Sequence, residues 1–323
     1  MIISIDIGNG FIKALNSKNN YLHFPSIVKK QIAKVTSFSA MEKYIVYLDN
    51  NYYYVGESAI TKKGRRSWSN TKMNEFTDIF IATCLNLLSE DSKNIDLCLG
   101  LPYSYYVEQN DGQYLIDEYT NKTIDCTVNG IQKKINISSV TVIPQGGGAF
   151  YSNILSNNNT NDLNSYFIDI GYRTVDCVEF IFSNNNLSLN HETSFSLEEN
   201  GTYEIFNNIL KFVSAEVGKH WNVIEIENAI LHNNYILIYN SIEKYDIHQI
   251  AETLFEDSAN EIFSEILFNV PRITKIENIY LSGGGAKFLY PYFKNLLPNI
   301  KLQKNSIFAN ADGYLQLSKI NKK

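Results

Sequence analysis

One tetrapeptide occurs twice in this chain, and the repeat restricts the possible folds more than any other sequence feature. Ile5-Asp6-Ile7-Gly8 and Ile168-Asp169-Ile170-Gly171 are identical, and about half of the 323 residues separates them. Four identical residues alone can arise by chance. Each copy, however, ends an apolar segment that is typical of a β-strand. A tight turn then leads into a second such segment, as in a β-hairpin. The matched context favours two similar halves, each presenting one Asp-x-Gly loop to the other.

Composition restricts the class of protein. At roughly 150 residues per domain, the length predicts about two domains. The 44% hydrophobic and 19% charged residues exclude wholesale disorder. The net charge of −6 argues against direct DNA binding, although a local basic patch stays possible.

The chain also lacks the usual signs of export or membrane insertion. No apolar run approaches the ~18 residues that a membrane span needs. The first six residues contain no basic region, and Asp6 interrupts their apolar stretch. The four cysteines show no CxxC spacing, so reduced thiols are expected. We therefore expect a cytoplasmic protein without a membrane partner.

Apolar patterning predicts an α/β fold. Glycine- and asparagine-rich turns separate the periodic segments, and the Asn-rich segment 156–164 is the best candidate for a boundary between the halves. Strands are expected at 2–7, 11–15, 44–48, 52–55, 95–99, 140–143, 166–170, 174–183, 187–191 and 279–281. Helices are expected at 75–88, 149–155, 202–217, 225–231, 248–268 and from 286 onward.

The two repeated loops have a chemistry that suits a phosphate ligand. Glycine turns at strand ends let backbone N–H groups approach phosphate oxygens closely. An aspartate beside such a loop repels phosphate, but it can hold the water shell of Mg²⁺. Asp6 and Asp169 are therefore predicted to form a pair around a Mg²⁺-nucleotide.

Two further side chains near these loops are candidates for the same site. Lys13 lies three residues beyond Gly10, where its ammonium group could meet a β-phosphate; a solvated strand lysine is the alternative. Gln145 follows a predicted strand and precedes three glycines. Its amide could orient a water molecule for in-line attack, or it could simply cap a helix.

A third glycine cluster follows a strand near the end of the chain. Ser282-Gly283-Gly284-Gly285 opens a predicted helix, and such a floor lets a base and ribose lie against the backbone. Taken alone, it could be any tight strand-to-helix turn. Neither GxxxxGK[ST] nor GxGxxG occurs, which argues against P-loop and Rossmann nucleotide sites.

Together, these loops resemble those of the actin, Hsp70 and sugar-kinase superfamily of ATPases. The resemblance covers two phosphate loops, two connecting segments and an adenosine motif along essentially the whole chain. These are, in chain order, Asp6-x-Gly8-Asn9-Gly10-x-x-Lys13, Pro144-Gln145-Gly146, Asp169-x-Gly171-x-Arg173-Thr174-x-Asp176, Leu281-Ser282-Gly283-Gly284-Gly285 and Phe308-Ala309-Asn310-Ala311-Asp312-Gly313-Tyr314. Within the superfamily, the sequence is most similar to ParM/StbA-type actin-like proteins.

The resemblance implies a ribonuclease H-like, two-lobe fold with duplicated mixed β-sheets flanked by helices and a nucleotide cleft between the lobes. The first lobe would comprise residues 1–160 and 305–323, with a small insertion at about 30–94. The second would comprise 161–304, with an insertion at about 200–274.

The resemblance also implies site roles. Asp6 and Asp169 would organise Mg²⁺ and its waters, and Gln145 would position the attacking water, although many relatives carry Glu there. The nucleotide would be ATP, with GTP possible. It would contact Gly8, Asn9, Gly10, Lys13, Gly171, Arg173 and Thr174, a ribose glycine at Gly201, and the floor of Gly283, Gly284 and Gly285.

The implied function is nucleotide-dependent assembly into polar filaments, with a DNA-bound adaptor linking the filament to plasmid DNA. A small-molecule kinase is an alternative, but neither Asp96 nor Asp111 has the pattern of its general base. A regulatory or chaperone-like ATP-binding module is another. The basic segment Lys62–Arg66 could contact a filament neighbour or an adaptor, or could be solvated charge.

Overall fold

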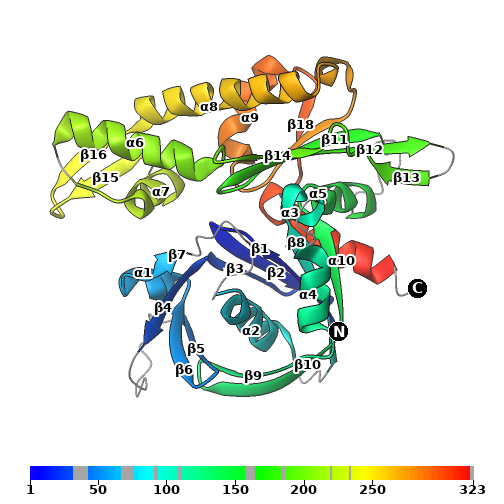
Figure 1. Ribbon diagram of the computed structural model, residues 1–323. Helices are drawn as coiled ribbons and strands as arrows, with labels where there is room; N and C mark the ends of the chain where they lie inside the picture. The colour runs from blue at the N-terminus through cyan, green and yellow to red at the C-terminus, as the bar shows by residue number, and fades with distance from the viewer. Residues whose placement is uncertain are drawn as a thin grey trace.

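Two mixed β-sheets, one in each half of the chain, form the framework of the computed structural model (Figure 1). The structure describes residues 1–31, 43–66, 76–90, 94–107, 111–156, 164–183, 186–218, 220–232 and 234–320. The first sheet has the order β3 (Tyr21–Pro25), β2 (Phe11–Asn16), β1 (Ile2–Ile7), β8 (Asn94–Leu101), β10 (Ile131–Pro144), β9 (Thr123–Val128), β5 (Tyr44–Leu48), β6 (Asn51–Val55), β4 (Ile27–Gln31) and β7 (Arg65–Arg66).

The second sheet repeats the arrangement at the start of the first. Its order is β13 (Asn186–Leu189), β12 (Thr174–Ser183), β11 (Ser165–Ile170), β17 (Ile279–Ser282) and β18 (Ile300–Leu302), and β14 (Phe195–Glu198) also pairs with β12. In both sheets an antiparallel hairpin adjoins parallel strands: β2–β1–β8–β10 corresponds to β12–β11–β17–β18. This correspondence confirms the duplicated α/β fold that the repeated tetrapeptide predicts.

The first sheet curves around a central helix (Figure 1). That helix, α2 (Thr77–Leu88), is the expected helix at 75–88, but it is buried on almost every side rather than amphipathic. A β-bulge between Ile137 and Ser139 interrupts β10, and bulges bend the strands that carry them. The curved sheet therefore covers faces of α2 that a flat sheet would leave in water. The short helices of this half are α1 (Glu57–Thr61), α3 (Tyr103–Val107) and α4 (Asp111–Tyr119).

Four longer helices cover the second half (Figure 1). They are α6 (Thr202–Val217), α7 (Val223–His232), α8 (His248–Asn269) and α9 (Ala286–Leu296). Between α7 and α8 lies a hairpin of β15 (Ile236–Tyr239) and β16 (Glu243–Asp246), which the sequence patterning did not predict. Among the described residues, no helix is both long and apolar enough to cross a membrane.

The end of the chain returns to the first half. Helix α10 (Ala309–Ile320) contacts β1, β2, β8 and helix α5 (Gly147–Tyr151), which continues as a π-helix over Ser152–Ser156. A methyl group on Gly313 would lie 1.7 Å from the carbonyl oxygen of Gly148, so only glycines allow this crossing. An apolar cluster then joins the halves: Phe150 of α5 stacks on Phe180 of β12, with their centroids 3.9 Å apart.

Candidate functional site

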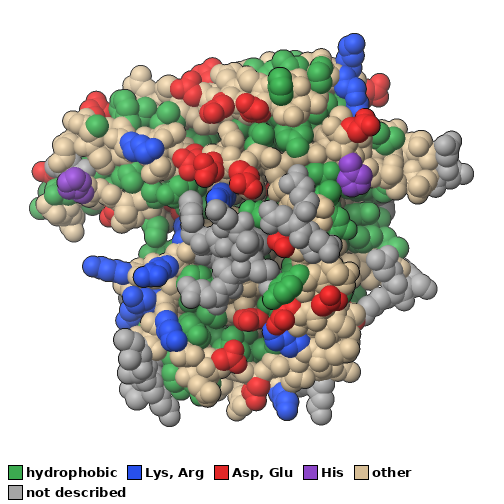
Figure 2. Space-filling model, in the orientation of Figure 1, with side chains coloured by type: hydrophobic (Ala, Val, Ile, Leu, Met, Phe, Trp, Pro, Cys, Tyr) green, Lys and Arg blue, Asp and Glu red, His purple; other side chains and the backbone are tan. Residues whose placement is uncertain are grey.

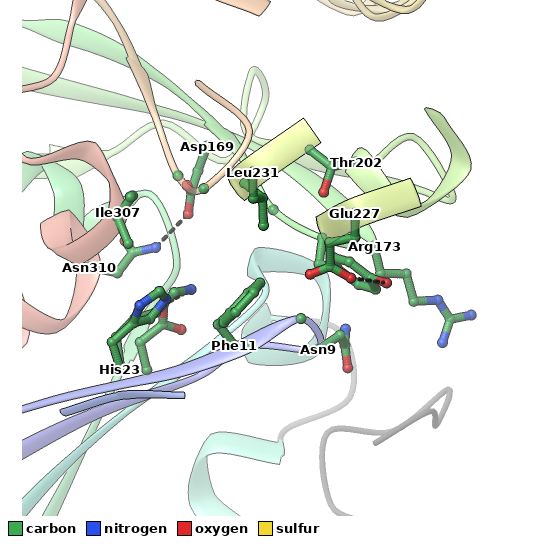
Figure 3. A pocket seen from close by; sticks show the side chains of 18 of the residues that line it. Asn9, Phe11, His23, Asp169, Arg173, Thr202, Glu227, Leu231, Ile307 and Asn310 are labelled. Atoms are coloured by element: carbon green, nitrogen blue, oxygen red, sulfur yellow. Dashed lines mark hydrogen bonds and ion pairs between the residues drawn. The ribbon is translucent and has the colours of Figure 1, made fainter. Parts of the chain in front are cut away.

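A cavity of about 330 Å³ lies between the two sheets, where the repeated hairpins face each other (Figure 3). Both halves line it, because β1 and β11 end on opposite sides of the space. Most of the predicted site residues meet there. They are Asp6, Gly8, Asn9, Gly10, Lys13, Gln145, Asp169, Gly171, Arg173, Thr174, Gly283 and Gly284.

Asp6 is held at both carboxylate oxygens. Lys13, opposite Asp6 on β2, places its Nζ 3.0 Å from Oδ2. Gln145 follows β10, and its Nε2 donates a 2.9 Å hydrogen bond to Oδ1. Asp6 and Gln145 are buried, and the Lys13 side chain is only 13% exposed. Lys13 is therefore an ion-paired residue of the cavity wall rather than a solvated strand lysine.

Asp169 faces Asp6 from the second half with a different set of partners. Asn310, on α10, donates from Nδ2 to Asp169 Oδ2 at 2.5 Å (Figure 3). Burial, and secondarily the neighbouring carboxylate of Asp176, raise the pKa of Asp169 to about 7. Asn310 also accepts hydrogen bonds at Oδ1 from the N–H groups of Gly146 and Ala149, both at 3.1 Å. One side chain thus connects the C-terminal helix, the Gln145 segment and Asp169.

The two carboxylates fit a hydrated divalent cation. Asp6 and Asp169 are only 3% and 4% exposed, yet each faces a cavity that can hold a ligand. Within the described residues, no group of three or more His, Cys, Asp or Glu side chains is arranged to hold a metal by itself. Mg²⁺ commonly binds through one or two carboxylates, its own waters and substrate phosphates. The donor set therefore suits a metal that arrives with a phosphate ligand.

The repeated loops turn in the same way. A methyl group on Gly8 would lie 2.7 Å from the carbonyl oxygen of Phe11, and one on Gly171 would lie 2.8 Å from that of Thr174. Contacts below 3 Å are incompatible with a Cβ, so both turns require glycine. Each turn places its backbone at the cavity wall, which is the geometry that a phosphate-binding loop needs.

The third glycine cluster has three different local environments. Gly283 has φ +91° and lies against the carbonyl oxygen of Ile170, whereas a methyl group on Gly284 would meet no atom within 4 Å. Gly285 packs on the Ile170 side chain and does not line the cavity. Gly201 likewise lies behind the wall, where it lets the start of α6 approach Tyr172.

Several residues of the cavity were not predicted from the sequence. Phe206, Leu231 and Phe288 give it an apolar part, and Thr202 and Glu227 contribute polar groups. Helical periodicity predicts a buried face for these helices, but it cannot show that the face borders a cavity. Asn310 belongs to the 308–314 motif, but its contact with Asp169 was not predicted.

Two basic side chains, His23 and Arg173, line the cavity without facing Asp169 as cations. His23 stacks on Phe11, with centroids 4.8 Å apart, and burial together with the charge of Lys13 lowers its pKa to about 4. His23 is therefore neutral at neutral pH. Arg173 lines the cavity, but its guanidinium group points away from Asp169 and lies 3.9 Å from the carboxylate of Glu199 (Figure 3).

Comparisons with known proteins identify two matching domain models and several similar structures. Residues 4–148 match the family model of the N-terminal domain of actin-like proteins, and residues 167–295 match the C-terminal model of archaeal MreB-like actin homologues. A ParM from a 15-stranded filament of Clostridium botulinum is 25% identical, with TM-score 0.85 and 99% of both chains covered. A non-polymerisable quadruple mutant of pCBH ParM is also 25% identical, with TM-score 0.83 over 99% of both chains.

A second group of similar structures is archaeal. The archaeal actin homologue Ta0583 has TM-score 0.84 at 20% identity, with 99% of both chains covered, and it shares the fold. Its complex with ADP has TM-score 0.80 at 18% identity, again over 99% of both chains. No curated protein matches the sequence. The two family models lie on either side of the Asn-rich segment at 156–164, and each contains one copy of the repeated loop.

Proposed function

Because the chain belongs to the actin-like proteins, we propose that it is an ATPase that assembles into filaments when it binds nucleotide. The observation that carries this proposal is the convergence of Asp6 and Asp169. They end corresponding strands of a duplicated sheet and line one cavity together with Lys13 and Gln145. A pair of loops in this arrangement can hold a triphosphate from both sides.

Each group at the cavity has a defined task in this proposal. The glycine turns at Gly8 and Gly171 offer backbone N–H groups to phosphate oxygens, and Lys13 adds a positive charge. Asp6 and Asp169 hold the waters of Mg²⁺, which offsets phosphate charge when it is bound. Gln145, fixed by Asp6, orients the attacking water.

The sugar and base lie at the apolar end of the cavity in this proposal. Gly283 and Gly284 form the floor for the base. Phe206 and Phe288 supply apolar surface there. Gly201 and Gly285 lie behind the cavity wall and shape it through their close backbone packing on Tyr172 and Ile170. A glycine floor accepts adenine or guanine, so we propose ATP as the nucleotide and GTP as a possible substitute.

Filament structures among the relatives of the chain support the proposed assembly. Similar structures include the ParM filament of Clostridium botulinum and an AlfA filament bound to AMPPNP. We propose that this chain forms a polar filament in the bacterial cytoplasm and moves plasmid DNA through a DNA-binding adaptor. The net charge of −6 supports an adaptor, because an acidic filament repels the phosphate backbone. The lobes in this proposal comprise 1–160 with 305–323, and 161–304.

Ultracentrifugation of the purified chain tests the proposal. Over a series of protein concentrations, the chain should move into the pellet with Mg²⁺-ATP and stay in the supernatant without nucleotide. The Asp169→Asn variant should stay in the supernatant under both conditions. Pelleting that is equal with and without nucleotide would contradict the proposal. ATP consumption that requires an added small-molecule acceptor, without pelleting, would indicate a kinase instead.

A further inference from the structure

The basic segment Lys62–Arg66 divides into two parts in the structure. Lys62, Lys63 and Arg65 are exposed, and Figure 2 shows Lys and Arg side chains gathered at this corner of the first half, near α1 and β7. Arg66 differs, because its side chain is only 11% exposed. Neighbouring strand residues point to opposite sides, so Arg65 faces water when Arg66 faces the cleft. The charge of Arg66 therefore has a separate role.

Arg66 contacts three elements that belong to both halves. Its Nη1 donates a 2.6 Å hydrogen bond to the carbonyl oxygen of Gly10, in the first glycine loop. Its Nη2 lies 2.7 Å from Glu227 Oε2, on α7 of the second half. The guanidinium carbon lies 4.4 Å from the ring centroid of Tyr172, in the second glycine loop. One side chain thus connects both glycine loops and α7.

The partners of Arg66 also contact one another. A methyl group on Gly10 would lie 2.6 Å from the Tyr172 ring, so the two loops are already in contact. Tyr172 donates from its hydroxyl to Glu227 Oε2 at 3.4 Å. The Glu227 side chain is only 4% exposed, and Arg66 is the cation that offsets its charge. Gly10, Tyr172 and Glu227 all line the cavity.

A guanidinium group suits this position for geometric reasons. Its planar fork can donate to a carbonyl from one nitrogen and to a carboxylate from another, while its face lies on an aromatic ring. A lysine ammonium cannot make all three contacts at once. Loss of the cation would also leave the Glu227 carboxylate buried without a counter-charge, which favours separation of α7 from the first half.

We propose that Arg66 is a positioning residue that holds the two glycine loops together over a bound nucleotide and thereby sets how long the nucleotide stays. The inference rests on the proposed nucleotide site. Arg66 binds the loop carbonyl and α7 rather than the reacting atoms, so its loss should act on nucleotide release more than on chemistry. Separation of the contacts at Gly10, Tyr172 and Glu227 opens one side of the cavity.

Stopped-flow release of a fluorescent ATP analogue tests this role, with unlabelled ATP as the chase. Arg66→Met should accelerate release by about tenfold to a hundredfold, the range for a lost charged hydrogen bond. Arg65→Met, which removes the adjacent exposed charge, should release at the wild-type rate within about twofold. Arg66→Lys should fall between wild type and Arg66→Met.

The Glu227→Gln variant tests the ion pair between Arg66 and Glu227 by removing the negative partner. It keeps the shape of the side chain and should also accelerate release. The two groups act as one unit. The double variant Arg66→Met/Glu227→Gln should therefore release nucleotide more slowly than the product of the two single-variant accelerations would give. Melting temperatures without nucleotide separate this role from general destabilisation, since release should change much more than the melting temperature.

The outcomes distinguish failure of the Arg66 role from failure of the proposed nucleotide site. If Arg66→Met and Glu227→Gln released nucleotide at the wild-type rate, while the wild type bound nucleotide normally, the role of Arg66 would be overturned and the proposed function would stand. Equal acceleration in Arg65→Met would also overturn it, because the effect would then be one of general surface charge. If the wild-type chain bound no nucleotide, both the proposed function and this inference would fall.

Discussion

Lys13 and Asp176 occupy the same position in the two copies of the repeated hairpin. Lys13 lies opposite Asp6 across β1 and β2, and Asp176 lies opposite Asp169 across β11 and β12. Side chains opposite each other on antiparallel strands share one face. Asp6 therefore has a cation beside it, whereas Asp169 has a second carboxylate. The two halves share a backbone design but differ in charge, because Asp169 lies beside another carboxylate where Asp6 lies beside an ammonium group.

The first prediction concerns the pH dependence of stability. The pKa of Asp169 rises from 3.8 to about 7 in the folded chain. The folded state therefore holds a proton that the unfolded state has lost between about pH 4 and pH 7. Without nucleotide, this group makes the free energy of unfolding fall as pH rises through that window, by up to about 1.4 kcal/mol per unit. Above about pH 7 its contribution is constant.

Asp169→Asn isolates this effect, because asparagine does not titrate and can still accept from Asn310. Urea unfolding at pH 5, 6, 7 and 8 should show a shallower decline for the variant, which should be the more stable protein at pH 8. Its affinity for nucleotide should depend less on Mg²⁺ than that of the wild type, because only Asp6 remains to hold the waters of the metal. Parallel stability curves for variant and wild type would contradict the raised pKa of the buried Asp169 carboxylate.

The second prediction concerns Gln145. Removal of its amide in Gln145→Ala should leave nucleotide affinity nearly unchanged and slow phosphate release by about a hundredfold, the effect of a misplaced reactant. Filaments of the variant should therefore persist after assembly. The measurement is single-turnover phosphate release. A wild-type rate in that variant would exclude Gln145 from the reaction.

The third prediction compares two lysines of the first hairpin region. Lys13 pairs with buried Asp6, whereas Lys18 pairs with Glu90 in an exposed position, where both side chains are more than half exposed. Lys13→Met leaves the buried Asp6 carboxylate without its counter-charge and should lower the free energy of unfolding by about 3 kcal/mol. Lys18→Met should change it by less than about 1 kcal/mol. Chemical denaturation at pH 7 measures both, and equal effects would contradict the burial argument.

The fourth prediction uses two adjacent glycines. A methyl group on Gly284 meets no protein atom within 4 Å, whereas one on Gly285 would lie 2.4 Å from the Ile170 side chain. Gly285→Ala should therefore destabilise the fold by about 1 to 3 kcal/mol. Gly284→Ala should leave the melting temperature unchanged but weaken nucleotide binding if the base lies on this floor. Wild-type nucleotide affinity in Gly284→Ala would place the base elsewhere.

Much of the framework was predictable because it depends on local signals. The repeated Ile-Asp-Ile-Gly ends two buried strands, and only glycine fits the turn after each, so sequence and backbone agree. The hairpin of β15 and β16 was missed because its strands are only four residues long and partly exposed. The residues of β15 are all apolar and those of β16 are mostly charged, so neither strand alternates, and four residues are too few to separate strand from helix.

The site was predictable only where its residues adjoin a glycine turn. Asp6, Lys13, Gln145 and Asp169 meet as expected, since strand ends of parallel pairs lie at one edge of a sheet. The resemblance implied the return of the last helix to the first half, but not the contact of Asn310 with Asp169, because no local pattern encodes a contact between residues so far apart in sequence. Arg66 was read as part of a surface charge cluster, because its ion pair with Glu227 joins elements far apart in sequence.

Nucleotide-driven filament assembly can be measured by right-angle light scattering, recorded together with phosphate release over a protein concentration series. Mg²⁺-ATP should cause a rise in scattering above a critical concentration, and phosphate release should follow the rise. The same samples without nucleotide should stay flat. Flat scattering at every concentration, with ATP bound in the cavity, would contradict the account of a nucleotide-driven filament.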